Sequence, residues 1–140
     1  MSDDLIRMDA VDLIDGYRQG RFSPVDATAA VLARIHAVND KINAFMIIDD
    51  EGAMAAARES EARWSKGAPK GLIDGVPTTI KDLMLTKGWP TLKGSLTVDP
   101  AGPWDEDAPC VARLREHGAV LLGKTTTPEV GWKGITESAL

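Results

Sequence analysis

The sequence has little cysteine or histidine and no long apolar run. Its single cysteine, Cys110, excludes an internal disulfide, so a reducing cytoplasm is the expected compartment. The two histidines, His36 and His117, have no companions at metal-ligand spacing, and no metal or cofactor is expected. The longest apolar runs, such as Ala44–Ile48, are far shorter than the ~20 residues of a membrane span, and the acidic N-terminus lacks a secretory pattern. No membrane association is expected.

Positive charge is also scarce. The chain has 16 Lys and Arg residues against 21 Asp and Glu residues, a formal charge of −5, and both halves are acidic. Direct binding of nucleic acid is therefore not expected, because it needs a basic surface. The 44% apolar and 26% charged residues are typical of a globular chain, and 140 residues suffice for one domain with a real core.

Residues 1–67 are predicted to be mainly helical. Asp9 is suited to cap a first helix that ends at Gly20, and Ser23–Asp26 combines an N-cap serine, a proline and an acidic third residue. The second helix carries an apolar stripe at three- and four-residue spacing, made of Val25, Thr28, Leu32 and Ile35.

A short strand and a third helix complete this segment. Ala44–Ile48 is predicted to be a buried strand, and Asp49 and Asp50 are suited to cap a helix over Glu51–Lys66 with an alanine-rich face. The cluster Asp49–Glu51 and a second one, Asp105–Asp107, each precede a predicted helix. Their favourable placement against helix N-termini accounts for both without acid–base chemistry.

Residues 68–140 have a different character, because Gly and Pro punctuate short apolar runs. Thr78–Leu83 is predicted to be a strand. Thr86–Trp104 is predicted to be irregular, and loops of that length inside a compact domain are usually functional. Asp107 is then suited to cap a helix that turns Val111 and Leu114 inward and stops at Gly118, before a buried strand over Ala119–Leu122. A helix that leads into a short apolar strand indicates an α/β sheet.

Gly118–Thr125 satisfies the pattern of a phosphate-binding loop, with two glycines followed by Lys and Thr. A phosphate loop needs a strand before its first glycine and a helix that begins at the Lys-Thr pair. Here a predicted helix precedes Gly118, the predicted strand lies between the glycines, and Pro128 stands where the next helix should run. The pattern therefore does not predict nucleotide binding.

Lys81 is unusual because it lies inside an apolar predicted strand. One interpretation is a strand-end lysine that reaches water or pairs with a carboxylate. The other is a desolvated lysine, neutral often enough to accept a proton. Asp82 need not pair with it, because adjacent side chains of a strand point to opposite faces.

From Gly71 to its end, the chain resembles the front of an amidase signature family enzyme. The elements that carry the resemblance stand in order and at family spacing: Gly75–Asp82, Thr86–Gly88, Gly94–Ser95, Asp107–Leu114, Gly118–Val120, Gly123–Thr125, Glu129 and Gly131–Ser138. The resemblance implies an α/β fold, with N-terminal helices followed by part of a mixed α/β/α sheet. It divides one truncated domain into a helical segment, residues 1–67, and the first part of the family core, residues 68–140.

The resemblance also implies amide hydrolysis by a Ser–cis-Ser–Lys triad without a cofactor. Lys81 matches the lysine that acts as terminal base, and Ser138 falls in a stretch that lines the acyl pocket. The family places both serines in a downstream Gly/Ser-rich stretch that these 140 residues do not contain. The 140 residues alone are therefore expected to be inactive and poorly folded, with strand edges left unpaired.

Three functions stay open at this point. The first is a hydrolase of small-molecule carboxylic amides, which the loops Trp89–Gly94 and Gly131–Gly134 favour weakly. The second is the glutaminase subunit of a tRNA-dependent amidotransferase. The third is a non-catalytic, truncated scaffold or interaction module. The identity of the amide and the oligomeric state, including a homo-oligomer, also stay open.

Overall fold

A computed structural model describes residues 2–140, and describes side chains from residue 4 onward. The helices are α1 (Ser2–Leu5), α2 (Ala10–Arg18), α3 (Pro24–Ile42), α4 (Asp50–Trp64) and α5 (Pro109–Glu116). The strands are β1 (Phe45–Ile48), β2 (Pro77–Lys81) and β3 (Val120–Thr125), and a 3-10 turn, η1, spans Glu129–Gly131. The predicted α/β class, with helices first and a mixed sheet after them, is confirmed.

The sheet has the order β1-β3-β2. β3 runs antiparallel to β1 and parallel to β2, so β2, α5 and β3 form a crossover unit between parallel strands. β3 is the central strand, and it extends three residues beyond the predicted Leu122 because β1 pairs with Gly123–Thr125 and β2 with Lys124 and Thr125.

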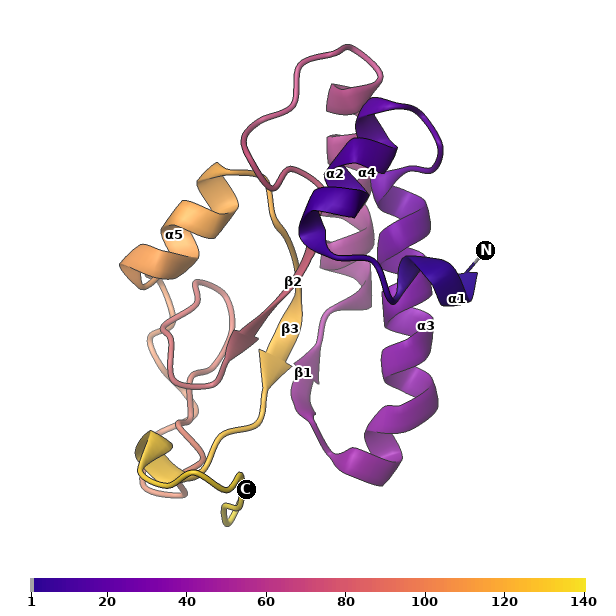
Figure 1. The fold of residues 1–140 in the computed structure, drawn as a ribbon. Coiled ribbons are helices and arrows are strands. Elements are labelled where there is room, and N and C mark those ends of the chain that lie inside the picture. The colour runs from indigo at the N-terminus through magenta and orange to yellow at the C-terminus, as the bar shows by residue number, and fades with distance from the viewer. Residues whose placement is uncertain (1) are drawn as a thin grey trace.

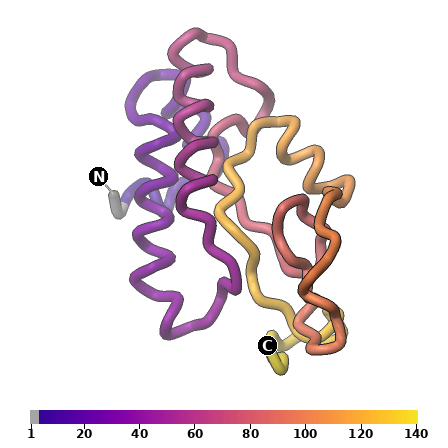
Figure 2. Tube along the Cα trace, turned by 180° about the vertical axis from the view of Figure 1, so that it is seen from behind, coloured from indigo at the N-terminus to yellow at the C-terminus, as the bar shows by residue number. Residues whose placement is uncertain are grey.

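Helices cover both faces of this sheet. α3 and α4 lie against one face, and α5 with the long loop after β2 lies against the other (Figures 1 and 2). Alternate β3 side chains therefore enter two different cores: Val120 and Leu122 pack with α3 and α4, whereas Leu121 packs with Ile80 and Val111 of the α5 layer. This is why the strand is a continuous apolar run.

The predicted helix starts are mostly confirmed. Asp9, Ser23 and Asp49 each accept a hydrogen bond from a backbone N–H of the following helix, and Ser23 with Asp26 forms a capping box. Asp107 is not a cap, so that prediction is wrong. Its carboxylate instead accepts hydrogen bonds from the Lys87 backbone N–H and the Arg115 guanidinium, which tie the long loop to α5.

The predicted inward faces are confirmed in part. Leu32, Ile35 and Val111 are buried as expected. Two other apolar residues of the helices meet water: Val11 of α2 is 69% exposed, and Cys110 of α5 is exposed. Both residues lie in helices whose buried stripe is narrow, so an apolar residue one position off that stripe meets water.

None of the helices in residues 2–140 is long and apolar enough to cross a membrane.

Candidate functional site

The carboxyl ends of β2 and β3 meet at one edge of the sheet. Lys81, the last residue of β2, pairs with Thr125, the last residue of β3, and the Asp82 N–H donates to the Thr125 carbonyl at 3.0 Å. The segments that follow, residues 82–108 and 126–140, leave the sheet from this edge. Crevices outside the carboxyl ends of parallel strands are the usual ligand sites of α/β sheets.

Lys81 stands between Ile80 and Asp82 in the sequence, and the side chains of both neighbours are buried. Ile80 is 4% and Asp82 is 0% exposed, whereas Lys81 is exposed and, within residues 2–140, its amine has no hydrogen bond or ion pair. The expectation that Asp82 and Lys81 point to opposite faces is confirmed. Of the two interpretations of Lys81, the described residues agree with a strand-end lysine that reaches water, because they leave its side chain exposed.

Asp82 instead forms an ion pair with Lys124 of β3, inside the protein. The Lys124 Nζ lies 3.1 Å from Asp82 Oδ1, and both side chains are 0% exposed. The ammonium also donates to the carbonyls of Met84, at 3.1 Å, and Pro90, at 3.0 Å, and to the Thr91 hydroxyl. Burial lowers the pKa of Lys124 below its ordinary value, opposed by its hydrogen bond and attraction to Asp82.

The Asp82 carboxylate extends the same network into the loop. Oδ1 accepts from the Leu92 N–H at 3.2 Å, and Oδ2 lies 3.4 Å from the Gly94 N–H. Asp82 thus ties the loop after β2 to itself, and Lys124 ties the loop to β3. Because Lys124 is committed to four oxygens, it is not free to act as a base.

This geometry explains the phosphate-loop pattern without a phosphate. The segment between the two glycines is strand β3, and Lys124 lies inside it. Gly123 has φ +146°, and a Cβ atom there would stand 2.0 Å from the Ile47 carbonyl oxygen of β1. The glycine is therefore required by close strand approach, and the lysine by the buried carboxylate. The sequence-based rejection of a nucleotide site agrees with this arrangement.

The far end of the loop packs against the segment that follows β3. A Cβ atom at Gly94 would stand 2.6 Å from the Thr127 carbonyl oxygen, and the Val130 N–H donates to the Lys93 carbonyl at 2.7 Å. Lys93 and Val130 both adopt positive φ, 57° and 52°. A β-branched residue rarely does so, and such strain persists only where the surrounding contacts impose it.

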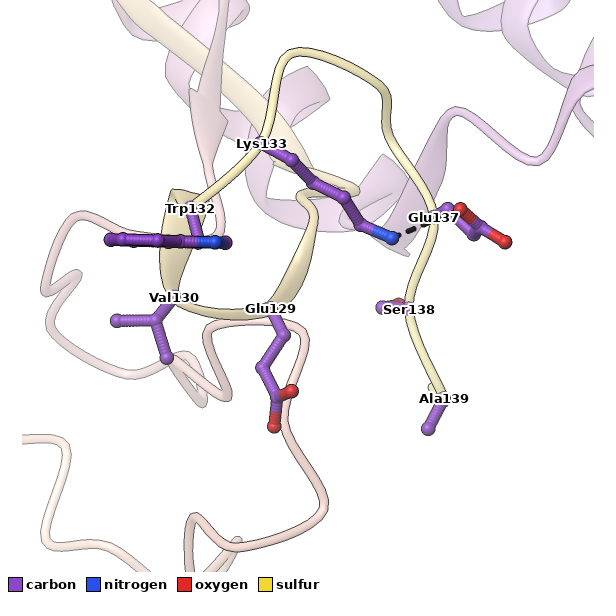
Figure 3. Close-up of a pocket in the computed structure, with 7 residues that line it drawn as sticks. All are labelled: Glu129, Val130, Trp132, Lys133, Glu137, Ser138 and Ala139. Carbon is purple, nitrogen blue, oxygen red and sulfur yellow. Dashed lines mark hydrogen bonds and ion pairs between the residues drawn. The ribbon is translucent and has the colours of Figure 1, made fainter.

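Ser138 lies in the exposed segment after η1. It lines a hollow of about 750 Å³ with six neighbours: Glu129, Val130, Trp132, Lys133, Glu137 and Ala139. Figure 3 shows Val130 and Trp132 on one side, Ser138 and Ala139 on the other, and the Lys133–Glu137 ion pair across the rim. The Ser138 hydroxyl donates to the Leu140 carbonyl at 3.3 Å.

Lys81 is not among the residues that line this hollow. Ser138 and Asp82, the residue after Lys81, do share a smaller one with Gly94. The acyl-pocket role of Ser138 therefore stays a prediction. Among residues 2–140 no group of His, Cys, Asp and Glu side chains has the arrangement of a metal site.

Sequence reasoning missed the Asp82–Lys124 pair. The available signal was Lys124 itself, directly after a run of four apolar residues and a glycine, in a strand that had to be buried. A lysine is almost never fully buried without a partner. The same argument that singles out Lys81 applies with more force to Lys124.

Comparison with known proteins places the chain in a family. The Amidase family model matches residues 26–140. The chain is 42% identical to a Glutamyl-tRNA(Gln) amidotransferase subunit from Salinispora tropica, over 96% of its own length and 27% of that protein's. It is 36% identical to the indoleacetamide hydrolase of Bradyrhizobium diazoefficiens, over 94% of this chain and 25% of that one.

Comparison with solved structures agrees with the family match. The native peptide amidase of Stenotrophomonas maltophilia superposes with a TM-score of 0.79 at 31% identity, over 88% of this chain and 25% of that one. The chain therefore belongs to the amidase signature family. It spans about a quarter of the length of these relatives.

Proposed function

We propose that this chain contributes the lysine base of an enzyme that hydrolyses a carboxylic amide to an acid and ammonia or an amine. The observation that carries the proposal is Lys81, an unpaired amine at the carboxyl end of β2 whose neighbouring carboxylate is held by Lys124. An amine without a counter-charge loses its proton more readily than one in an ion pair.

The residues have defined roles in this proposal. Lys81, when neutral, accepts a proton through a relay serine as the nucleophilic serine attacks the amide carbonyl, and later helps protonate the leaving amine. Water then cleaves the acyl-serine ester to give the acid and the free serine. Polypeptide beyond these 140 residues supplies both serines and covers Lys81, which restores the desolvation that the described residues do not provide. The 140 residues alone are expected to be inactive.

The test begins with an intact mass of the protein purified from its native gene. A mass well above 15.0 kDa directs the search for the serines to the continuation. Amide hydrolysis is then measured for the wild type, Lys81→Ala, Lys81→Arg and Lys66→Ala. Both Lys81 variants should lose at least about 100-fold in rate, because arginine cannot become neutral. Lys66, an exposed lysine beyond α4, is the matched control and should be unaffected.

Two results would contradict this function. A Lys81→Ala variant that keeps more than about a tenth of the wild-type rate is incompatible with proton transfer by Lys81. A mass of 15.0 kDa with no hydrolysis, in a cooperatively folded product, would favour the non-catalytic scaffold.

The second candidate function is the glutaminase of a tRNA-dependent amidotransferase. The specific support is the 42% identity to a Glutamyl-tRNA(Gln) amidotransferase subunit. Release of ammonia from glutamine, together with co-purification of a second subunit, would establish it. Hydrolysis of simple amides by a single polypeptide that ignores glutamine would exclude it. The 36% identity to an indoleacetamide hydrolase shows why identity alone does not decide between the two.

A further inference from the structure

We propose that Asp82 and Lys124 are a positioning pair for Lys81: Lys124 holds the Asp82 carboxylate inside the loop, so that it cannot become the counter-ion of Lys81. The proposal rests on the function proposed above, in which Lys81 works as an unpaired amine. It assigns a task to Lys124, the charged residue of the Gly118–Thr125 pattern, other than phosphate binding.

Asp82 is covalently next to Lys81, at the point where β2 ends and the chain turns. A carboxylate so close to an amine favours the ammonium form if the two side chains can meet. The strand alternation separates them only as long as Asp82 stays on the buried face. The position of this carboxylate therefore decides whether Lys81 has a counter-ion.

Asp82 is held on the buried face from several directions. Lys124 contacts it at 3.1 Å, and the Leu92 and Gly94 N–H groups lie 3.2 and 3.4 Å from its oxygens. Backbone hydrogen bonds alone seldom hold a carboxylate in a site without water, because desolvation of the charge is costly. The buried ammonium is the group that balances this charge.

Besides holding Asp82, Lys124 joins β3 to the loop after β2. Its remaining partners are two carbonyls and the Thr91 hydroxyl, all from the loop that Asp82 also binds. A buried pair of apolar side chains would join a loop to a strand at lower desolvation cost. The retained charge thus serves the carboxylate.

The experiment measures Lys81 directly and needs no turnover. Trace acetylation with acetic anhydride at neutral pH modifies neutral amines, and mass spectrometry gives the ratio of Lys81 to Lys66 labelling within each chain. The variants are Lys124→Gln, which keeps a donor but no charge, Asp82→Asn, and the double variant. All other charged side chains are the same in these variants, including Lys87 and Lys93 of the loop.

The proposal predicts which variants lower the Lys81 labelling ratio and which leave it unchanged. In Lys124→Gln the released carboxylate reaches Lys81, and the labelling ratio falls at least about threefold. In Asp82→Asn and in the double variant no carboxylate remains, so the ratio stays within about twofold of the wild type. The proposal requires restoration by the second substitution. Because that substitution also removes the uncompensated buried charge, the hydrogen-exchange and Arg63→Met controls are needed beside it to separate positioning from general loosening.

Hydrogen exchange and a control variant separate positioning from general loosening. The Leu92 and Gly94 amides should exchange at least about tenfold faster in Lys124→Gln. Arg63→Met, which breaks the distant ion pair with Asp74, should leave the Lys81 ratio unchanged. If Lys124→Gln does not fold, two other variants replace it. The first is Lys124→Met in the Asp82→Asn background. The second is Thr91→Val, which weakens only the hold on Lys124 and should lower the Lys81 labelling ratio as well.

Three results overturn the proposal. These are an unchanged ratio in the folded variants that release Asp82, an equal fall in the double variant, and an equal fall in Arg63→Met. The failure of the proposed function looks different: Lys81→Ala and Lys81→Arg would then keep their hydrolysis rate, whatever the labelling pattern shows.

Discussion

The two ends of β2 carry the same kind of group in two different settings. Asp74 precedes the strand, Asp82 follows it, and both carboxylates are 0% exposed. Arg63 binds Asp74 through two nitrogens, at 2.7 and 2.9 Å, and keeps 28% of its side chain exposed. Lys124 binds Asp82 with none of its side chain exposed.

The difference in solvation changes what each pair does. Burial raises the pKa of Asp74, but hydrogen bonds from Arg63 and the Lys70 N–H outweigh it, so the pKa is lowered overall. At the other end, burial is the largest influence on Lys124 and lowers its pKa. A pair that keeps water on its cation joins α4 to the sheet at modest cost. A fully buried pair is costly, and its cost points to a demand beyond stability.

The largest expected effect comes from breaking the fully buried pair. Lys124→Met should lower the free energy of unfolding by about 3–5 kcal/mol, because Asp82 is left as an uncompensated buried charge. Arg63→Met should lower it by less, since water can reach the Arg63 side of Asp74. Urea unfolding of both variants checks the order, and an equal loss would remove the contrast between the two ends.

A glycine substitution tests the strand that carries Lys124 without touching any charge. Gly123→Ala combines positive φ with a Cβ atom 2.0 Å from the Ile47 carbonyl oxygen, and should cost about 3 kcal/mol. The measurement is again urea unfolding, with Gly67→Ala as the control. Gly67 also has positive φ, +64°, but open space around it, so its cost should be smaller.

The pH dependence sharpens the comparison at the Asp74 end. The pKa of Asp74 lies below its ordinary value of 3.8 in the folded protein. The stability that it contributes is therefore fully present above that value and is lost as the pH falls through the lowered pKa. Asp74→Asn should cost about 2 kcal/mol at neutral pH. The gap between wild type and variant should narrow below pH of about 4, as acid unfolding of both would show.

The smallest effect is expected at Cys110, which belongs to neither pair. It is exposed on α5, so Cys110→Ala should change the unfolding free energy by no more than about 0.5 kcal/mol and leave amide hydrolysis unaltered. This variant serves as the reference for the smallest change in unfolding free energy that counts as an effect. A large loss of hydrolysis would place the nucleophile at Cys110 instead of at a serine.

Much of the fold follows from local chemistry and is predictable. Ser23, Pro24 and Asp26 start α3 by interactions within one turn, and β1 and the first half of β3 coincide with short apolar runs. Asp107 shows where local reasoning ends. It has the residue type and position of a cap, yet the Lys87 N–H and Arg115 compete for its carboxylate and win. No rule of local spacing contains those partners.

The same division applies to the site. Residue type and place in the motif single out Lys81, and its separation from Asp82 follows from strand alternation alone. The sequence leaves open whether Lys81 is exposed or desolvated, since covering a side chain depends on elements far away in the chain. The Asp82–Lys124 contact joins two segments far apart in the sequence, through the pairing of two parallel strands.

The sequence by itself determined the family, the starts of α2, α3 and α4, the order of helices and strands from α2 to β3, and the identity of the lysine to test. These depend on residues that are neighbours along the chain or on motifs in fixed order. Only the tertiary structure decided which of two lysines is free and which is bound. That outcome depends on desolvation and on the distance between charges, and both are properties of how segments meet in space.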